Sequence, residues 1–251
     1  HRRWYGFAFH PGFWDFLLTM HQRGRVISLD RVRKEVLEGD ELESWVADKV
    51  PDSFFASTVS EAVVGKLRAV LAASPGKRDV FVKIGDSNTA NTTFMSCLAA
   101  REPKMGAHLE LDETRRFFSV QKVDAQRSSF NRRSLAATVG WLAGQVLSGA
   151  PSFLDQEIAA AKPAFAVVML GTNDNRPAGL PIFTRNLAEI LDRTLAAGVI
   201  PLVSTIPPRD DSALAEARVE EINAAIRALA ERRQVPLMDL HAALLPLPQH
   251  G

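Results

Sequence analysis

Two short polar motifs in the chain carry the residue types needed for acyl transfer. Gly85-Asp86-Ser87-Asn88 follows one apolar run, and Gly171-Thr172-Asn173-Asp174 follows another. A serine hydroxyl can attack a carbonyl carbon, and an asparagine N–H can stabilise the negative charge that then develops on the carbonyl oxygen. Ser87 and Asn173 are therefore the first candidates for a nucleophile and an oxyanion donor.

The elements that must position these residues are predicted from hydropathy. Residues 79–84 are predicted to form a strand, and the apolar runs at 164–170, 199–205 and 235–240 are typical of parallel strands covered on both faces. Helical patterns separate them, with apolar faces formed by Leu187, Ile190, Leu191 and Leu195 and by Val219, Ile222, Ile226 and Leu229. This alternation predicts an α/β fold, a three-layer α/β/α arrangement with a mainly parallel sheet. Loops at the carboxyl ends of such strands share one edge, so Ser87 and Asn173 are expected to converge.

The chain is expected to divide where residues 73–79 are small, polar and turn-forming. The first part, residues 1–73, predicts a small helical fragment with one strand at 25–28. The second part, residues 74–251, holds the α/β pattern and both polar motifs.

Composition excludes several classes of protein. The 251 residues include 46% hydrophobic and 24% charged residues, as in ordinary globular proteins. Thirty basic and 29 acidic residues give a net charge of +1, which makes nucleic acid an unlikely principal partner. No apolar run is long enough to span a membrane. Cys97 is the single cysteine, and no Cys/His spacing is typical of a zinc site.

The two motifs together resemble the first and third blocks of the SGNH (GDSL-like) serine hydrolases. The resemblance extends over about residues 66–251 and includes Ser204-Thr205-Ile206-Pro207-Pro208 and Asn223. It implies a flavodoxin-like SGNH fold and an esterase or acyl hydrolase that needs no cofactor. It also implies that Ser87 is the nucleophile and that Asn173 and the backbone N–H of Gly140 are oxyanion donors. The implied substrate is a small-molecule or glycan ester, or an O-acetyl group.

One departure from that family concerns the general base. The family ends in an Asp-x-x-His block, but none occurs after residue 174, and Asp239-Leu240-His241 has the wrong spacing. We therefore expect the chain to be truncated at its C-terminus and impaired as an enzyme. His241 and His250 are interpreted as surface residues, because no spacing argument brings either within reach of Ser87.

The first part of the chain resembles a fragment of a PIN-type nuclease domain. Pro11-Gly12-Phe13-Trp14, Gly24-Arg25-Val26-Ile27-Ser28 and Arg31-Val32-Arg33-Lys34-Glu35 are among the segments that carry this resemblance. Glu35 matches a helix-borne acid that would bind Mg²⁺ or Mn²⁺, although one carboxylate cannot hold a catalytic metal. Two alternatives to the hydrolase follow: a metal-dependent, toxin-like ribonuclease, or a non-catalytic remnant or binding domain.

Each candidate residue also has a purely structural interpretation. Ser87 could be a helix N-cap, and Asn173 and Asp174 could be turn residues. Asp86 is expected to stabilise a turn, and Gly140 could permit close helix packing. Glu35 could be a solvated helix residue. Residues 115–118, Arg-Arg-Phe-Phe, are interpreted as a strand edge beside a core pair.

Overall fold

A four-stranded parallel sheet organises the larger part of the molecule. The computed structural model describes residues 28–29, 55–56, 61–106, 109–176, 179–209 and 211–245. The strands β3 (Lys77–Gly85), β4 (Pro163–Met169), β5 (Ile200–Ser204) and β6 (Leu237–Met238) lie in the order β3-β4-β5-β6, and each neighbouring pair is parallel. Residues 80–85 of β3 are all buried, as expected for a strand covered on both faces. All four strands agree with the predicted runs.

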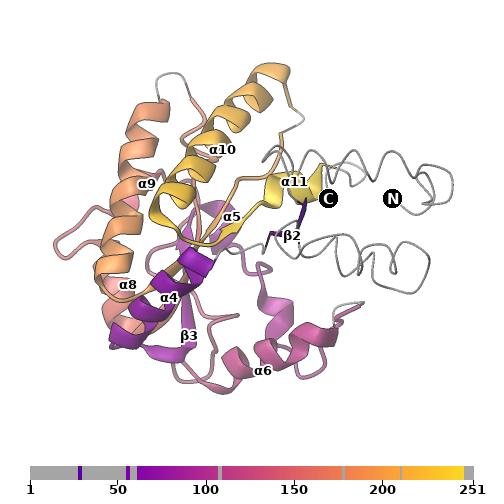
Figure 1. The fold of residues 1–251 in the computed structure, drawn as a ribbon, viewed down its shortest axis with the longest axis vertical. Helices are drawn as coiled ribbons and strands as arrows, with labels where there is room; N and C mark the ends of the chain where they lie inside the picture. Colours follow the sequence, from indigo (N-terminus) through magenta and orange to yellow (C-terminus); the bar gives the residue numbers. More distant parts are fainter. Residues whose placement is uncertain are drawn as a thin grey trace, which may run out of the picture. The chain divides into compact units, whose positions relative to one another are not determined.

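Helices α7 (Ala143–Val146), α8 (Phe153–Ala161), α9 (Gly179–Ala196) and α10 (Ala213–Arg233) contribute to the main core on one face of this sheet. Figure 1 shows α9 and α10 side by side. Their apolar faces are those predicted, and Leu187, Ile190, Val219 and Ile222 are at most 2% exposed. Burial of such residues contributes about 1.5–3 kcal/mol for each side chain, so this face supplies most of the stabilisation of the sheet.

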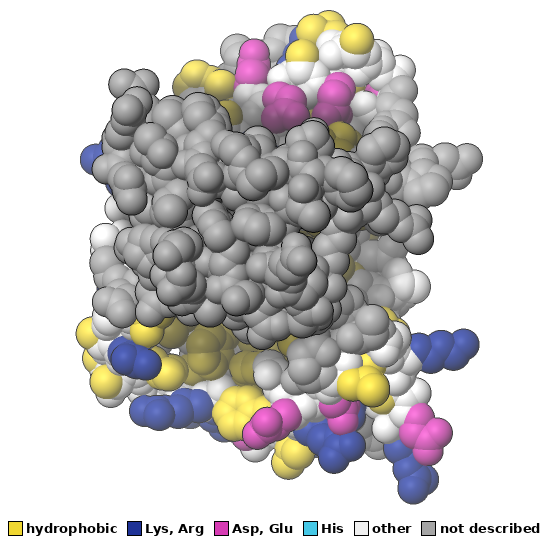
Figure 2. All heavy atoms as spheres, turned by 45° about the vertical axis from the view of Figure 1, so that its right-hand side comes forward, with side chains coloured by type: hydrophobic (Ala, Val, Ile, Leu, Met, Phe, Trp, Pro, Cys, Tyr) yellow, Lys and Arg dark blue, Asp and Glu magenta, His cyan; other side chains and the backbone are white. Residues whose placement is uncertain are grey.

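The opposite face of β3 and β4 is covered by α6 (Asp112–Val120) and the 3₁₀ helix η3 (Ser96–Ala99). The Phe81 ring contacts Phe118 and Phe130 edge-to-face, with centroids 5.5 and 5.1 Å apart. Helices on both faces confirm the three-layer α/β/α prediction. Figure 2 shows basic, acidic and apolar side chains exposed in the lower part of the described surface.

The prediction of a strand edge at residues 115–118 is wrong, because these residues lie in helix α6. Asp112 forms ion pairs with Arg115 and Arg116, three and four residues further along, at 2.6 and 2.7 Å. Such pairs favour a helix. Phe118 packs against the second core cluster, whereas Phe117 is half exposed.

The remaining described elements are short or lie at the ends of the larger unit. They are α4 (Glu61–Ala73), α5 (Ser87–Ala90), the 3₁₀ helix η4 (Leu109–Leu111) and α11 (Leu240–Leu244). Within the described residues, no helix combines the length and the apolar character needed to cross a membrane.

The chain forms two compact units, His1–Val64 and Gly65–Gly251. In the first unit, β1 (Ser28–Leu29) pairs in parallel with β2 (Phe55–Ala56). β1 overlaps the predicted strand at Ser28, but the sequence analysis did not predict β2. Glu35 and the predicted helical patterns of this unit lie outside the described residues.

Candidate active site

Ser87 lies at the carboxyl end of β3, where the chain turns from strand into helix. It is the first residue of α5, and Asp86 is the N-cap, with its Oδ1 accepting a hydrogen bond from the Asn88 N–H at 3.1 Å. The interpretation of Ser87 as a helix N-cap is therefore wrong, whereas Asp86 stabilises the turn as predicted. The Ser87 hydroxyl is not needed to cap the helix and is free for another role.

Gly85 is required because two strand ends approach closely at this position. A Cβ atom on Gly85 would lie 2.6 Å from the Met169 carbonyl oxygen of β4 and 2.0 Å from Thr89 Oγ1. Real side chains do not tolerate such contacts, so only glycine allows the β3 turn to pack against the end of β4. This packing brings the Ser87 turn beside the loop that carries Asn173.

Asn173 lies in the loop that follows β4, and hydrogen bonds tie this loop to both neighbouring segments. Asn88 Nδ2 donates to Thr172 Oγ1 at 3.2 Å, which joins α5 to the β4 loop. Asn173 Nδ2 donates to the Trp141 carbonyl oxygen at 3.0 Å. An asparagine amide has two N–H groups, so one N–H of Asn173 orients the side chain and the other remains to act as a donor.

Gly140 lies in the third segment of the site, which begins with an isolated parallel bridge between Ala137 and Gly85. The Gly85 N–H donates to the Ala136 carbonyl at 3.0 Å, and the Thr138 N–H donates to the Gly85 carbonyl at 3.3 Å. Gly140 has φ +80°, and nothing lies within 4 Å of the position of a Cβ. The helix-packing interpretation of Gly140 is therefore wrong, and glycine is favoured there by its left-handed backbone.

Two buried carboxyl groups lie beneath these loops. Burial raises the pKa of Asp86 above its ordinary value, and the hydrogen bond from the Asn88 N–H opposes this effect. Burial also raises the pKa of Asp174, whose Oδ2 accepts a hydrogen bond from the Ala143 N–H at 3.1 Å. Asp174 therefore connects the β4 loop to the start of α7, and it is more than a turn residue. Among the described residues, Asp86 Oδ2 has no hydrogen-bond partner.

His241 is buried, and its interpretation as a surface residue is wrong. It is 1% exposed, its backbone N–H donates to Thr205 Oγ1 at 2.9 Å, and its Nε2 lies 2.9 Å from Glu216 Oε1. These hydrogen bonds compensate for the loss of water around a buried polar ring. Sequence analysis missed this contact because Glu216 and His241 come from different elements, α10 and α11. His250 lies outside the described residues.

A pocket of about 680 Å³ borders α5 and the loop that leads to Gly140. Its lining includes Thr89 and Ala90 of α5 and Thr138 and Val139 of that loop. The other lining residues are mostly cationic or polar: Lys83, Asn91, Thr92, Arg127, Asn131, Arg132, Arg133 and Ser134, with Ala137. Four cations and no acid line the pocket, so its walls favour a polar, negatively charged group.

Solved structures with a similar fold include several hydrolases. A lipase/acylhydrolase from Enterococcus faecalis is 19% identical, with 69% of this chain and 82% of that chain covered and a TM-score of 0.49. A GDSL-like lipase from Bacteroides thetaiotaomicron is 14% identical, with 74% and 81% covered and a TM-score of 0.44. An acetylxylan esterase from Geobacillus stearothermophilus is 16% identical, with 68% and 78% covered and a TM-score of 0.43. Similarity at this level carries no information on substrate.

Family comparisons divide the chain in two. Residues 1–95 match a domain of unknown function (DUF4411). No curated protein matches the chain. Residues 84–250, which include Ser87, Gly140 and Asn173, match the GDSL-like lipase/acylhydrolase family. Because this match covers more than half of the 251 residues, the chain belongs to the GDSL-like lipase/acylhydrolase family.

Proposed function

We propose that this chain is a serine acyl hydrolase in which Ser87 attacks the carbonyl carbon of an ester or O-acetyl group. The tetrahedral oxyanion that results would be held by the Ser87 N–H, the second N–H of Asn173 and the Gly140 N–H. These roles are the usual ones in acyl transfer. The nucleophile attacks the carbonyl carbon, and fixed N–H donors stabilise the negative charge that develops in the transition state.

The observation that carries the proposal is the joining of three loops by their motif residues. Asn88 contacts Thr172, Asn173 contacts Trp141, and Gly85 pairs with Ala137. Each contact involves a residue within three positions of a proposed catalytic residue. The three loops therefore form one hydrogen-bonded unit at the carboxyl edge of β3 and β4, where parallel sheets bind their ligands.

These 251 residues contain no general base of the kind that the family uses. No Asp-x-x-His follows residue 174, and Nε2 of His241, which is the one histidine in the described part of the chain, faces Glu216. We infer that these 251 residues acylate slowly by themselves, because an unassisted serine hydroxyl is a weak nucleophile.

Labelling with a fluorophosphonate probe tests the proposed nucleophile. We expect the 251-residue chain to react slowly at Ser87, the reaction to accelerate when imidazole is added as an external base, and Ser87→Ala to abolish labelling. Peptide mass spectrometry identifies the labelled residue. Ser96→Ala, which changes a serine outside the three loops, is the matched control and should label normally.

The outcome also separates the proposal from its alternatives. Folded protein that is not labelled even with imidazole would support a non-catalytic domain that retains the fold. Labelling that persists in Ser87→Ala would place the reactive group elsewhere. Thermal unfolding of each variant establishes that loss of labelling does not come from loss of the fold.

The pocket beside α5 supports a substrate with an anionic group next to the ester. Arg132 is paired with Glu157, and Lys83 donates to the Phe130 carbonyl, whereas Arg127 and Arg133 are exposed and have no ion pair within the described part of the chain. Arg127 and Arg133 are therefore the two cations of the pocket that can bind an anionic ligand without breaking an existing ion pair.

A matched pair of activated esters tests this preference. We expect the mono-4-nitrophenyl ester of succinate to acylate Ser87 about fivefold faster than 4-nitrophenyl butyrate, as follows from about 1 kcal/mol for a partly screened ion pair. Arg133→Ala should reduce the difference, and replacement of both Arg127 and Arg133 by alanine should remove it. The rate is measured as nitrophenolate release above the Ser87→Ala background. Equal rates for the two esters would contradict the anionic substrate and leave the nucleophile assignment intact.

A further inference from the structure

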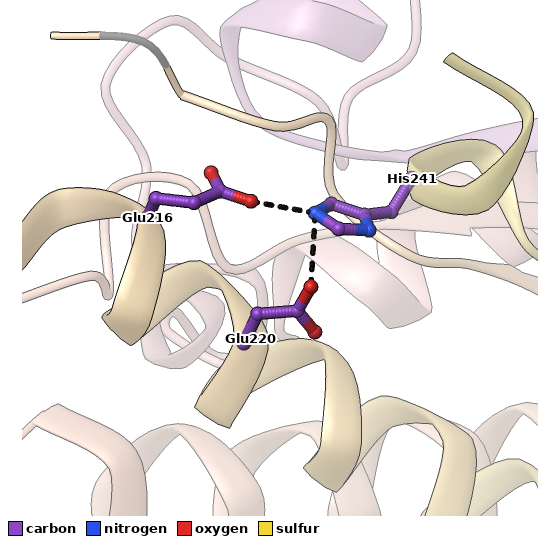
Figure 3. A group of neighbouring side chains, drawn as sticks. All are labelled: Glu216, Glu220 and His241. Atoms are coloured by element: carbon purple, nitrogen blue, oxygen red, sulfur yellow. Dashed lines mark hydrogen bonds and ion pairs between the residues drawn. The ribbon is translucent and has the colours of Figure 1, made fainter. Parts of the chain in front are cut away.

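Three potential metal ligands converge at the far end of the sheet, beside β6. Figure 3 shows Glu216 and Glu220, one turn apart on α10, directed at the ring of His241 at the start of α11. His241 Nε2 lies 2.9 Å from Glu216 Oε1 and 3.5 Å from Glu220 Oε1. One ligand atom from each of the three residues lies within 4.8 Å of the others.

The single hydrogen that His241 Nε2 can carry cannot make hydrogen bonds to both glutamate carboxylates. One ring nitrogen carries at most one hydrogen, so Nε2 can donate one good hydrogen bond, and the 2.9 Å contact to Glu216 takes it. The Glu220 oxygen at 3.5 Å then lies beside a second carboxylate without a hydrogen bond from the ring. Like charges four residues apart on a helix repel each other. A divalent cation between the three atoms would bond to all of them and neutralise both carboxylates.

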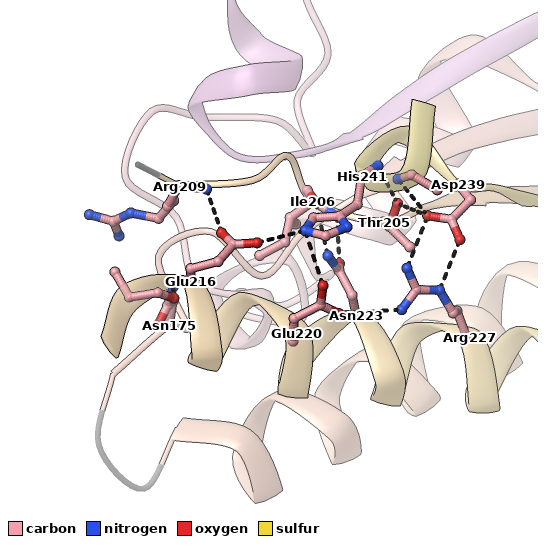
Figure 4. Close-up of polar contacts among 12 residues, drawn as sticks. Asn175, Thr205, Ile206, Arg209, Glu216, Glu220, Asn223, Arg227, Asp239 and His241 are labelled. Atoms are coloured by element: carbon pink, nitrogen blue, oxygen red, sulfur yellow. Dashed lines mark hydrogen bonds and ion pairs between the residues drawn. The ribbon is translucent and has the colours of Figure 1, made fainter. Parts of the chain in front are cut away.

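Neighbouring groups hold the two glutamate side chains and the backbone of His241 in place, as Figure 4 shows. Glu216 Oε2 accepts a hydrogen bond from the Arg209 backbone N–H at 2.6 Å, which leaves Oε1 directed at the ring. Glu220 Oε2 lies 3.8 Å from Arg227 Nη1. The His241 backbone N–H is bonded to Thr205. Outer contacts that orient ligand atoms in this way are typical of metal sites.

We propose that Glu216, Glu220 and His241 bind one divalent transition-metal ion, with Zn²⁺ as the first choice. Metal–ligand bonds of about 2.0–2.2 Å place neighbouring ligand atoms roughly 3–3.5 Å apart. His241 Nε2 lies close to this range from both glutamates, at 2.9 and 3.5 Å, and all three ligand atoms lie within 4.8 Å of one another. An imidazole nitrogen favours Zn²⁺ over Mg²⁺ or Ca²⁺.

The ion would connect α10 to the segment that follows β6. Ser87 follows β3, and β3 and β6 are at opposite ends of the strand order. The site is therefore separate from the proposed acyl-transfer loops and does not depend on the proposed function. Its role would be structural, holding α11 against α10.

Zn²⁺ titration of the chelator-treated 251-residue chain tests the site, with affinity measured by competition against a chromogenic chelator. We expect Glu220→Gln to weaken Zn²⁺ binding at least about tenfold, the lower range for disturbing a metal site. Glu220 is exposed, so this variant should fold. Glu221→Gln changes the same charge on the adjacent exposed residue and should bind Zn²⁺ as the wild type does.

Other histidines outside the described residues could bind zinc, but they are the same in all three proteins and do not affect the comparison. Zn²⁺ should also raise the midpoint of thermal unfolding of the wild type and Glu221→Gln, and not that of Glu220→Gln. Equal affinity in both variants, or no saturable binding by the wild type, would overturn the proposal. The three residues would then form only a hydrogen-bonded contact between α10 and α11.

Discussion

Replacing Arg132 by alanine is expected to lower the free energy of unfolding by about 3–5 kcal/mol. The guanidinium of Arg132 pairs with both oxygens of Glu157, and Nη2 lies 3.1 Å from Oε2. The Glu157 side chain is 0% exposed, and its Oε2 also accepts the Leu135 N–H at 2.8 Å. Without Arg132, the buried Glu157 carboxylate would keep one backbone donor and only the Coulombic interaction with Lys83, whose ammonium donates to the Phe130 carbonyl. Loss of a buried, hydrogen-bonded partner is more costly than loss of an exposed one.

Urea denaturation at neutral pH measures this change, and Arg133→Ala is the matched control. Arg133 is the adjacent residue, is exposed and has no ion pair in the described part of the chain. Its replacement should change the free energy of unfolding by no more than about 0.5 kcal/mol. If Arg132→Ala changed the free energy of unfolding as little as Arg133→Ala does, the prediction would be wrong. The buried Glu157 side chain would then be stabilised in another way, by protonation or by a water molecule. Because Leu135 immediately precedes the segment that pairs with Gly85, Arg132→Ala should also slow labelling of Ser87.

Replacing Asn173 by alanine is expected to slow reaction at Ser87 about 10²–10³-fold. This is the effect of removing one oxyanion donor, about 2.7–4 kcal/mol of transition-state stabilisation. The change removes the free N–H that we assign to the oxyanion, and also the 3.0 Å bond to Trp141. The measurement is the rate of fluorophosphonate labelling in the presence of imidazole.

Asn175→Ala separates the two effects of this substitution. Asn175 Nδ2 donates to the Ala215 carbonyl at 3.1 Å, so its removal costs one amide-to-carbonyl hydrogen bond of the same kind. Asn175 has no role in the proposed oxyanion hole, and its variant should retain the labelling rate. Similar slowing in both variants would mean that Asn173 acts only by holding the loop.

The strands and the two long helices were predictable because their burial leaves a local pattern. β4 and β5 are almost entirely apolar, and the buried part of β3 is apolar except for Lys83, since both faces of a parallel strand inside a three-layer fold are covered. The apolar faces of α9 and α10 recur with the helical period for the same reason. The segment between β3 and β4 was less predictable. Its helices α6, α7 and α8 have nine residues or fewer, too few to establish a period, and α6 was interpreted as strand.

Order and residue type along the chain were enough to predict that Ser87 and Asn173 follow two strands at the same edge of one sheet, because parallel strands present their carboxyl ends at one edge. Only the tertiary structure decided how the loops are joined: that Asn173 bonds to Trp141, that Gly140 is needed for its backbone angle, and that Arg132 neutralises Glu157. Only the tertiary structure decided, likewise, that His241 is buried against two glutamates of α10. These contacts join residues from different elements, and they form through packing, which leaves no periodic signal in the sequence.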